Sequence, residues 1–343
     1  MTAPAARLRD LGFSRRSAAA PLALALLFAV SALSLFLGPA SLDPFHVVQG
    51  LLGQGNEITN TIVRELRVPR LALSLCVGAI LAAAGAALQG YLRNPLAEPA
   101  LLGASNAAAL GAVIALHSGI AGASFYVMPL AAGASTLIAM ALLLAFTVRA
   151  TSTLTLVLTG IAIASLAGAG ISLVLNLSTN PFAAMEIAFW LLGSVEDRSM
   201  RHVALAVPFI GVGMVLLFWD ARALDALSLG QEPAESLGFG LKAVRMRLIL
   251  GVSIGVGAAV SVAGAIGFVG LVAPHIARGL GYTSPSRVLL PSALIGAGLV
   301  TAADILVRTL PTTNELKLGV VTAILGAPFL VFILRRAQSR SFG

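Results

Sequence analysis

The chain has 343 residues, of which 58% are hydrophobic and only 10% are charged, and its mean hydropathy is +0.96. This composition excludes an ordinary soluble protein and predicts a polytopic membrane protein. The net charge of +8 at pH 7 would suggest nucleic-acid binding in a soluble chain. Here we expect the lysine and arginine residues that flank apolar runs to orient helices in the membrane.

Residues 1–19 are predicted to form a cytoplasmic N-terminal tail, because four arginines precede the first apolar run. That run resembles the apolar part of a signal peptide but is longer, and no clear cleavage site follows it. We therefore interpret it as a retained first span.

About ten helical spans are predicted, because one span needs about 20 mostly apolar residues. The runs are continuously apolar, whereas the strands of a transmembrane β-barrel would alternate apolar and polar residues. The eighth span is expected to be short and interrupted at Pro274. The expected spans are 20–38, 67–91, 97–117, 123–147, 153–176, 201–220, 243–266, 269–281, 289–308 and 317–335. Residues 20–336 then form one transmembrane domain, followed by a cytoplasmic tail of residues 337–343.

Two features describe how these spans are organised. With the N-terminus inside, fifteen lysines and arginines fall on the inner side and seven on the outer side, which places both termini and residues 220–247 in the cytoplasm. A shift of 179 residues also gives eight identities in nineteen positions between residues 77–95 and 256–274. Five spans separate these segments, so they cross in opposite directions, as in the inverted-topology repeats of many transporters.

Five blocks carry a resemblance to a known family. The blocks are RVPR (67–70), GAILAAAGAALQGYLRNPLAEPALLGASN (78–106), AGAIGFVGLVAPHIARGLG (263–281), VLLPSALIGAGLVTAADILVR (288–308) and ELKLGVVTAILGAPFLVFILRR (315–336). In this order they resemble the permeases of the iron-siderophore, haem and cobalamin ABC importer family, the type II importers. The chain departs from the family pattern at Tyr282–Arg287, at Thr312–Thr313 and at Lys317, which puts the geometry of two interhelical connections in doubt.

The resemblance implies an all-α membrane protein of about ten helices with the type II importer permease fold. It implies a homodimer, or a pair of homologous permeases, in the bacterial inner membrane, together with two ABC ATPase subunits and a periplasmic substrate-binding protein. The expected function is import of a ferric siderophore, haem or cobalamin. No side chain of this sequence selects among these cargoes.

The resemblance also assigns roles to residues of this sequence. Residues 221–240 match the family's coupling helices, which contact the ATPase. From the residues alone, this segment could equally be a solvated cytoplasmic loop. The residues expected at this contact are Leu224, Leu227, Leu229, Gly230, Glu232, Ala234, Leu237 and Gly238. Docking of the binding protein is expected at Arg67, Arg70 and Arg308, and the cytoplasmic gate at Asn94, Leu96, Thr151 and Ser152.

Alternatives to these roles and to this function remain at this point. Arg67 and Arg70 could snorkel to lipid headgroups, and Arg308 could pair with Asp304 one helical turn before it. The competing functions are an ion-coupled secondary transporter, which normally needs intramembrane carboxylates, and a membrane-embedded enzyme, for which we find no catalytic motif.

No cofactor or metal is expected to bind to this chain. Its single cysteine, Cys76, lies in an apolar run, and His275 and Arg278 are more simply explained by helix-end packing than by haem or metal binding. The sequence also lacks the G-x-x-x-x-G-K-[ST] phosphate-binding loop. ATP and magnesium are therefore expected in the partner ATPase, and the chain itself is not expected to be an enzyme.

Overall fold

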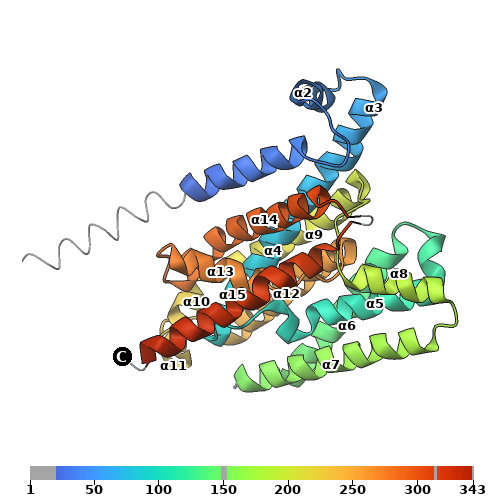
Figure 1. The fold of residues 1–343 in the computed structure, drawn as a ribbon. Helices are drawn as coiled ribbons and strands as arrows, with labels where there is room; N and C mark the ends of the chain where they lie inside the picture. The colour runs from blue at the N-terminus through green and yellow to red at the C-terminus, as the bar shows by residue number, and fades with distance from the viewer. Residues whose placement is uncertain (1–20, 148–152, 313–314, 342–343) are drawn as a thin grey trace, which may run out of the picture.

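The structure is a computed structural model that describes residues 21–147, 153–312 and 315–341. Within these ranges the regular elements are helices (Figure 1). In chain order they are the first helix (Pro21–Phe36), α2 (Pro44–Leu52), α3 (Glu57–Asn60), η1 (Thr61–Arg67), α4 (Val68–Leu92), η2 (Pro99–Leu102), α5 (Ala104–His117), η3 (Ile120–Ala123), α6 (Val127–Thr147), α7 (Thr153–Leu177), α8 (Pro181–Leu191), α9 (Met200–Trp219), α10 (Ala221–Leu227), α11 (Gln231–Ser236), α12 (Leu241–Ala263), α13 (Val269–Gly279), α14 (Pro285–Thr309) and α15 (Leu318–Ser341).

A helix lies in each of the ten expected spans, and six helices of the described residues are long and apolar enough to cross a membrane. Two expectations need correction. Pro274 lies inside α13 and does not interrupt it. The third span also begins later than predicted, because Pro99–Leu102 form a 3-10 turn before α5 starts at Ala104.

The long helices run side by side, and short helices mark the two ends of the bundle (Figure 1). We call the end that carries α2 and α3 the α2 end, and the opposite end, which carries α10 and α11, the α10 end. Helix α4 lies at the centre of the bundle, and most of its residues from Val77 to Tyr91 are buried. Contacts with α9, α12, α13 and α14 surround it.

Two glycines of α4 bring it into backbone contact with its neighbours. A Cβ atom at Gly78 would lie 2.2 Å from the carbonyl oxygen of Gly296 in α14, and one at Gly85 would lie 2.0 Å from that of Gly270 in α13. Seven residues, about two helical turns, separate the two glycines, so both lie on one face of α4. Close approach through small residues is the usual way in which helices pack in lipid.

We expect Gly85→Ala to destabilise the protein by about 1–3 kcal/mol, because the added methyl group meets backbone that cannot rotate away. Gly133→Ala in α6 is the matched control, since a Cβ atom there meets nothing within 4 Å. Thermal unfolding in detergent, followed by size-exclusion chromatography, compares the two variants. Equal melting temperatures would contradict the close contact between α4 and α13.

The two helices that carry the sequence repeat, α4 and α12, run in opposite directions. Helix α4 runs from the α2 end to the α10 end, whereas α12 runs the opposite way (Figure 1). Helix α4 packs on α14, and α12 packs on α6 and α9. The halves differ where α4 continues to Leu92 but α12 ends at Ala263, because the chain turns through Gly264 and Phe268, both with positive φ, before α13 begins.

Candidate functional site

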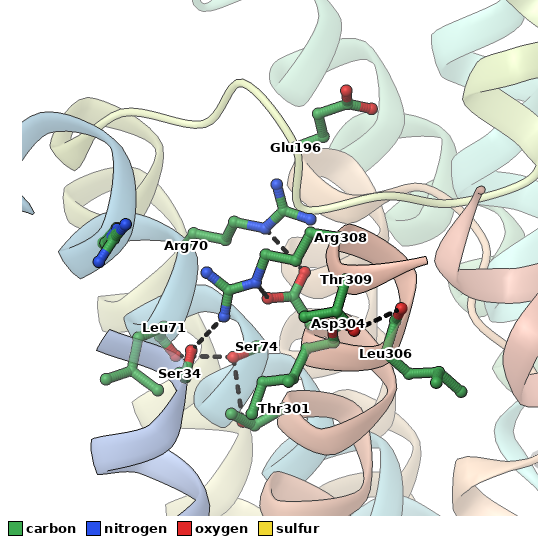
Figure 2. Close-up of polar contacts among 12 residues, drawn as sticks. Ser34, Arg70, Leu71, Ser74, Glu196, Thr301, Asp304, Leu306, Arg308 and Thr309 are labelled. Carbon is green, nitrogen blue, oxygen red and sulfur yellow. Dashed lines mark hydrogen bonds and ion pairs between the residues drawn. The ribbon is translucent and has the colours of Figure 1, made fainter. Parts of the chain in front are cut away.

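A buried group of ion pairs lies at the α2 end, where α4, α14 and the segment before α15 meet (Figure 2). We call Arg70, Asp304, Arg308 and Glu315 the Asp304 cluster. The Asp304 side chain is completely buried and lies between two guanidinium groups. Its Oδ1 atom accepts a hydrogen bond of 2.8 Å from Arg70 Nε, and its Oδ2 atom lies 3.2 Å from Arg308 Nε. Arg70 also forms an ion pair with Glu315.

The Asp304 cluster is connected to the first helix by two arginines. Arg308 Nη2 donates a hydrogen bond of 2.6 Å to Ser34 Oγ. Arg67, which is buried, donates to the carbonyl oxygens of Leu35 and Ala40 at 2.7 Å and 2.5 Å. These carbonyl groups lie near the C-terminus of the first helix, where backbone oxygens lack partners within the helix. The arginines therefore hold the end of the first helix against α4 and α14.

The three arginines predicted to dock a binding protein all bind groups of the chain itself. The alternative that pairs Arg308 with Asp304 is confirmed. Snorkelling of Arg67 and Arg70 is wrong, because their guanidinium groups bind carbonyl oxygens and carboxylates of the chain itself. Docking of a binding protein at these residues stays a prediction, and any such contact would have to compete with the internal bonds.

Lys317, one of the departures from the family pattern, has a partner that the sequence did not reveal. Its Nζ atom lies 2.6 Å from Glu196 Oε2 in the connection between α8 and α9. The next residue, Leu318, donates its backbone N–H to Gly193 O at 2.9 Å, which holds the start of α15 against the same connection. Arg198 lies in the same segment between α8 and α9. Burial lowers the pKa of its guanidinium group, while the nearby carboxylates of Asp197 and Glu196 oppose the shift.

At the α10 end, the two short helices expected around Gly230 are present as α10 and α11. Gly230 and Gly238 both have positive φ, at 129° and 88°, which glycine adopts without strain. Gly238 follows the last turn of α11, the usual place for such a glycine. The sequence therefore specifies both the turn between these helices and the end of the second helix.

The residues predicted to contact an ATPase fall into two sets. Leu224, Leu227 and Ala234 are buried within the chain, so they position α10 and α11 and are not available to a partner. Leu229 and Leu237 are 71% and 62% exposed. An exposed pair of leucines beside a sharp turn is the part of this segment that a partner protein could cover.

Polar contacts attach α10 and its flanking residues to the bundle. Asp225 accepts hydrogen bonds from the backbone N–H and the hydroxyl group of Ser286, at 2.8 Å and 2.5 Å. Asp220, just before α10, forms a bidentate pair with Arg247 of α12 at 2.6 Å and 2.7 Å. Helix α10 is thereby fixed to α12 and α14, so a force applied to it reaches both helices.

The predicted gate residues Asn94 and Leu96 lie in the turn after α4. Asn94 Oδ1 accepts a hydrogen bond of 2.9 Å from Leu96 N, an arrangement in which asparagine favours a turn, and Leu96 is 38% exposed. Thr151 and Ser152, the other two predicted gate residues, lie outside the described residues. The structure therefore describes two of the four predicted gate residues, and their role in a gate stays a prediction.

A polar network joins this turn to α13. Gln89 Nε2 donates to the carbonyl oxygens of Ala97 and Gly270 at 3.2 Å and 3.1 Å, and Arg278 Nη1 donates to Gln89 Oε1 at 2.6 Å. The sequence analysis did not single out Gln89, although a glutamine in an otherwise apolar span is a visible signal. Within the described part of the chain, no three His, Cys, Asp or Glu residues lie together as a metal site.

Comparison with known proteins agrees with the fold. An ABC transporter permease protein of Bacillus subtilis is 38% identical over 292 residues, covering 84% of this chain and 82% of the relative. A vitamin B12 import system permease of Vibrio vulnificus is 38% identical over 318 residues, covering 92% of this chain and 93% of the relative. An Fe(3+)-citrate import system permease of Bacillus subtilis is 35% identical over 311 residues, covering 90% and 92%.

A solved structure extends the agreement to three dimensions. It is described as an inward-facing metal-chelate type ABC transporter, and its chain superposes with a TM-score of 0.83 at 28% identity, over 92% of this chain and 97% of that chain. The fold and its relatives define a transmembrane permease subunit of an ABC importer, a transporter component rather than an enzyme. The model of the FecCD transport family matches residues 26–336, so the chain belongs to that family.

Proposed function

We propose that this chain imports a ferric siderophore, haem or cobalamin from the periplasm to the cytoplasm, with energy from a partner ABC ATPase. Membership of the FecCD family and similarity to permeases for siderophores, vitamin B12 and Fe(3+)-citrate support a ferric complex or cobalamin as the cargo. In this proposal the α10 end faces the cytoplasm, two copies of the permease enclose the path, and a binding protein delivers cargo at the α2 end.

The observation that carries the proposal is the pair of exposed leucines on a firmly attached segment. Leu229 and Leu237 are available for contact, while Asp225 and Asp220 fix α10 to α14 and α12. ATP-driven motion of a partner can move a membrane helix only through such a rigid connection. The turn at Asn94 and Leu96, linked to α13 through Gln89, would serve as part of the cytoplasmic gate.

Copurification and reconstitution test this function. We expect the tagged chain to purify with its ABC ATPase as two permeases and two ATPases, as measured by native mass spectrometry. In proteoliposomes with the binding protein, uptake of one of the three cargoes should require ATP and should persist when ion gradients are collapsed. Uptake driven by an ion gradient without ATP would overturn the proposal and would favour the secondary transporter.

A further inference from the structure

A cavity of about 370 Å³ opens at the α10 end, between the first helix and the start of α14. Ala23 of the first helix forms one wall, the turn after α13 contributes Leu280 and Tyr282, and the first turns of α14 contribute Arg287 and Leu290. The cavity shares Ser286 with the attachment of α10 described above, and its other lining residues belong to no site described above. It lies in the region where the sequence departs from the family pattern, Tyr282–Arg287.

The cavity opens toward the apolar surroundings of the bundle. Leu290 at its edge is 56% exposed, and the neighbouring first helix exposes Leu22 and Leu26 at 56% and 57%. In a membrane-spanning bundle, such a surface faces lipid chains. An occupant that enters from this side therefore has an apolar portion.

The charged group in the lining of the cavity is the guanidinium group of Arg287. Arg287 is exposed, and within the described residues it makes no ion pair and no side-chain hydrogen bond. The carboxylate of Asp225 is already bound by the N–H and hydroxyl groups of the adjacent residue, Ser286. Arg287 and the phenol group of Tyr282 are thus the polar groups left to bind a ligand.

We propose that this cavity binds an anionic phospholipid, with an acyl chain between the first helix and α14 and the phosphate on Arg287. A free phosphate ion would use the arginine but not the apolar wall. Basic pockets between helices at the cytoplasmic side of a membrane typically bind anionic headgroups. The assignment of the α10 end to the cytoplasmic leaflet rests on the proposed function.

The position of the lipid links it to the segment proposed to contact the ATPase. Arg287 directly follows Ser286, which holds Asp225 of α10 through two hydrogen bonds. A phosphate bound to Arg287 fixes the first turn of α14 and, through Ser286, the orientation of α10. ATP-driven uptake should therefore be faster in vesicles that contain phosphatidylglycerol than in vesicles of phosphatidylcholine alone.

Lipid retention by the purified full-length chain tests the proposal without any partner protein. The chain in mild detergent is mixed with phosphatidylglycerol or phosphatidylcholine and examined by native mass spectrometry. Arg287→Glu should retain at least about fivefold less phosphatidylglycerol than the wild type, since one arginine contributes about 1 kcal/mol near an anionic headgroup. Arg335→Glu is the matched control, because Arg335 is exposed on α15 and lies outside the cavity, and it should retain lipid like the wild type.

Leu290→Trp fills the apolar edge of the cavity while leaving Arg287 in place, and it should also reduce retention of phosphatidylglycerol. If Arg287→Glu does not fold, this second variant tests the proposal. Equal retention of phosphatidylglycerol by the wild type and by a folded Arg287→Glu or Leu290→Trp variant overturns the proposal. So does displacement of the lipid by inorganic phosphate, which would indicate a simple anion site. Retention of phosphatidylglycerol that appears only after deletion of residues 1–20 would also overturn the proposal, because that segment would then be the occupant of the cavity. None of these results depends on whether the chain transports its proposed cargo.

Discussion

Asp304→Ala is expected to lower the stability of the protein by about 3–5 kcal/mol, the usual cost of removing one partner from a buried ion pair. The carboxylate is fully buried between Arg70 and Arg308. Without it, Arg308 keeps only its hydrogen bond to Ser34 among the described residues, and its charge stays buried beside that of Arg70. In detergent, the melting temperature should fall by roughly 5–10 °C.

Two further variants make this result specific. Glu65→Ala removes an exposed carboxylate at the same end of the bundle and should leave the melting temperature almost unchanged. Asp304→Ala combined with Arg308→Met removes both charges of one pair and should recover part of the lost stability, because the cost comes from the unpaired cation. A melting temperature for Asp304→Ala equal to that of Glu65→Ala would contradict the buried cluster.

The same cluster guides experiments on docking of a binding protein. A charge reversal such as Arg308→Glu places a second carboxylate beside Asp304, so it should weaken the fold whether or not a binding protein contacts Arg308. Loss of docking in such a variant is informative only when its melting temperature has been measured as well.

Leu229→Glu is expected to abolish ATP-driven uptake while the chain still folds. The side chain is 71% exposed beside the turn at Gly230, so a charge there costs the isolated protein little. At a desolvated protein contact, the same change removes an apolar anchor and buries a charge, which typically costs at least about 2 kcal/mol, or roughly thirtyfold in affinity for the ATPase. Pull-down of the ATPase and uptake into proteoliposomes measure the two effects.

Ile58→Glu is the matched control for this experiment. Ile58 is also 71% exposed, but it lies in α3 at the opposite end of the bundle. Its variant should bind the ATPase like the wild type. Equal ATPase binding by Leu229→Glu and Ile58→Glu would refute the assignment of the contact to this turn.

The sequence was sufficient for features whose cause is local. Apolar runs predicted the spans, and Gly230, Pro233 and Gly238 predicted two short helices with a turn between them, because each residue acts on the backbone beside it. The alignment of residues 77–95 with 256–274 predicted opposed helices, and α4 and α12 run in opposite directions.

Features that depend on distant partners were not predictable in this way. The partner of Arg70, Asp304, is 234 positions away in the chain, and the partner of Lys317, Glu196, is 121 positions away. An arginine at the start of a span looks the same in the sequence whether it faces solvent, lipid or a buried carboxylate. Leu224 and Leu227 are buried whereas Leu229 is exposed, although all three have the same side chain.

The glycine contacts of α4 limit how this protein can change shape. A Cβ atom placed on Gly296 would lie 2.3 Å from Cβ of Ala82, so displacing α14 along α4 by one residue would bring methyl groups into collision with the opposing backbone. Close backbone contact at Gly78 and Gly85 therefore opposes sliding of α14 and α13 along α4. Helix α7 has only 11% of its apolar window buried within the chain. An opening and closing motion that leaves these contacts intact would instead pivot at the helices around the edge of the bundle.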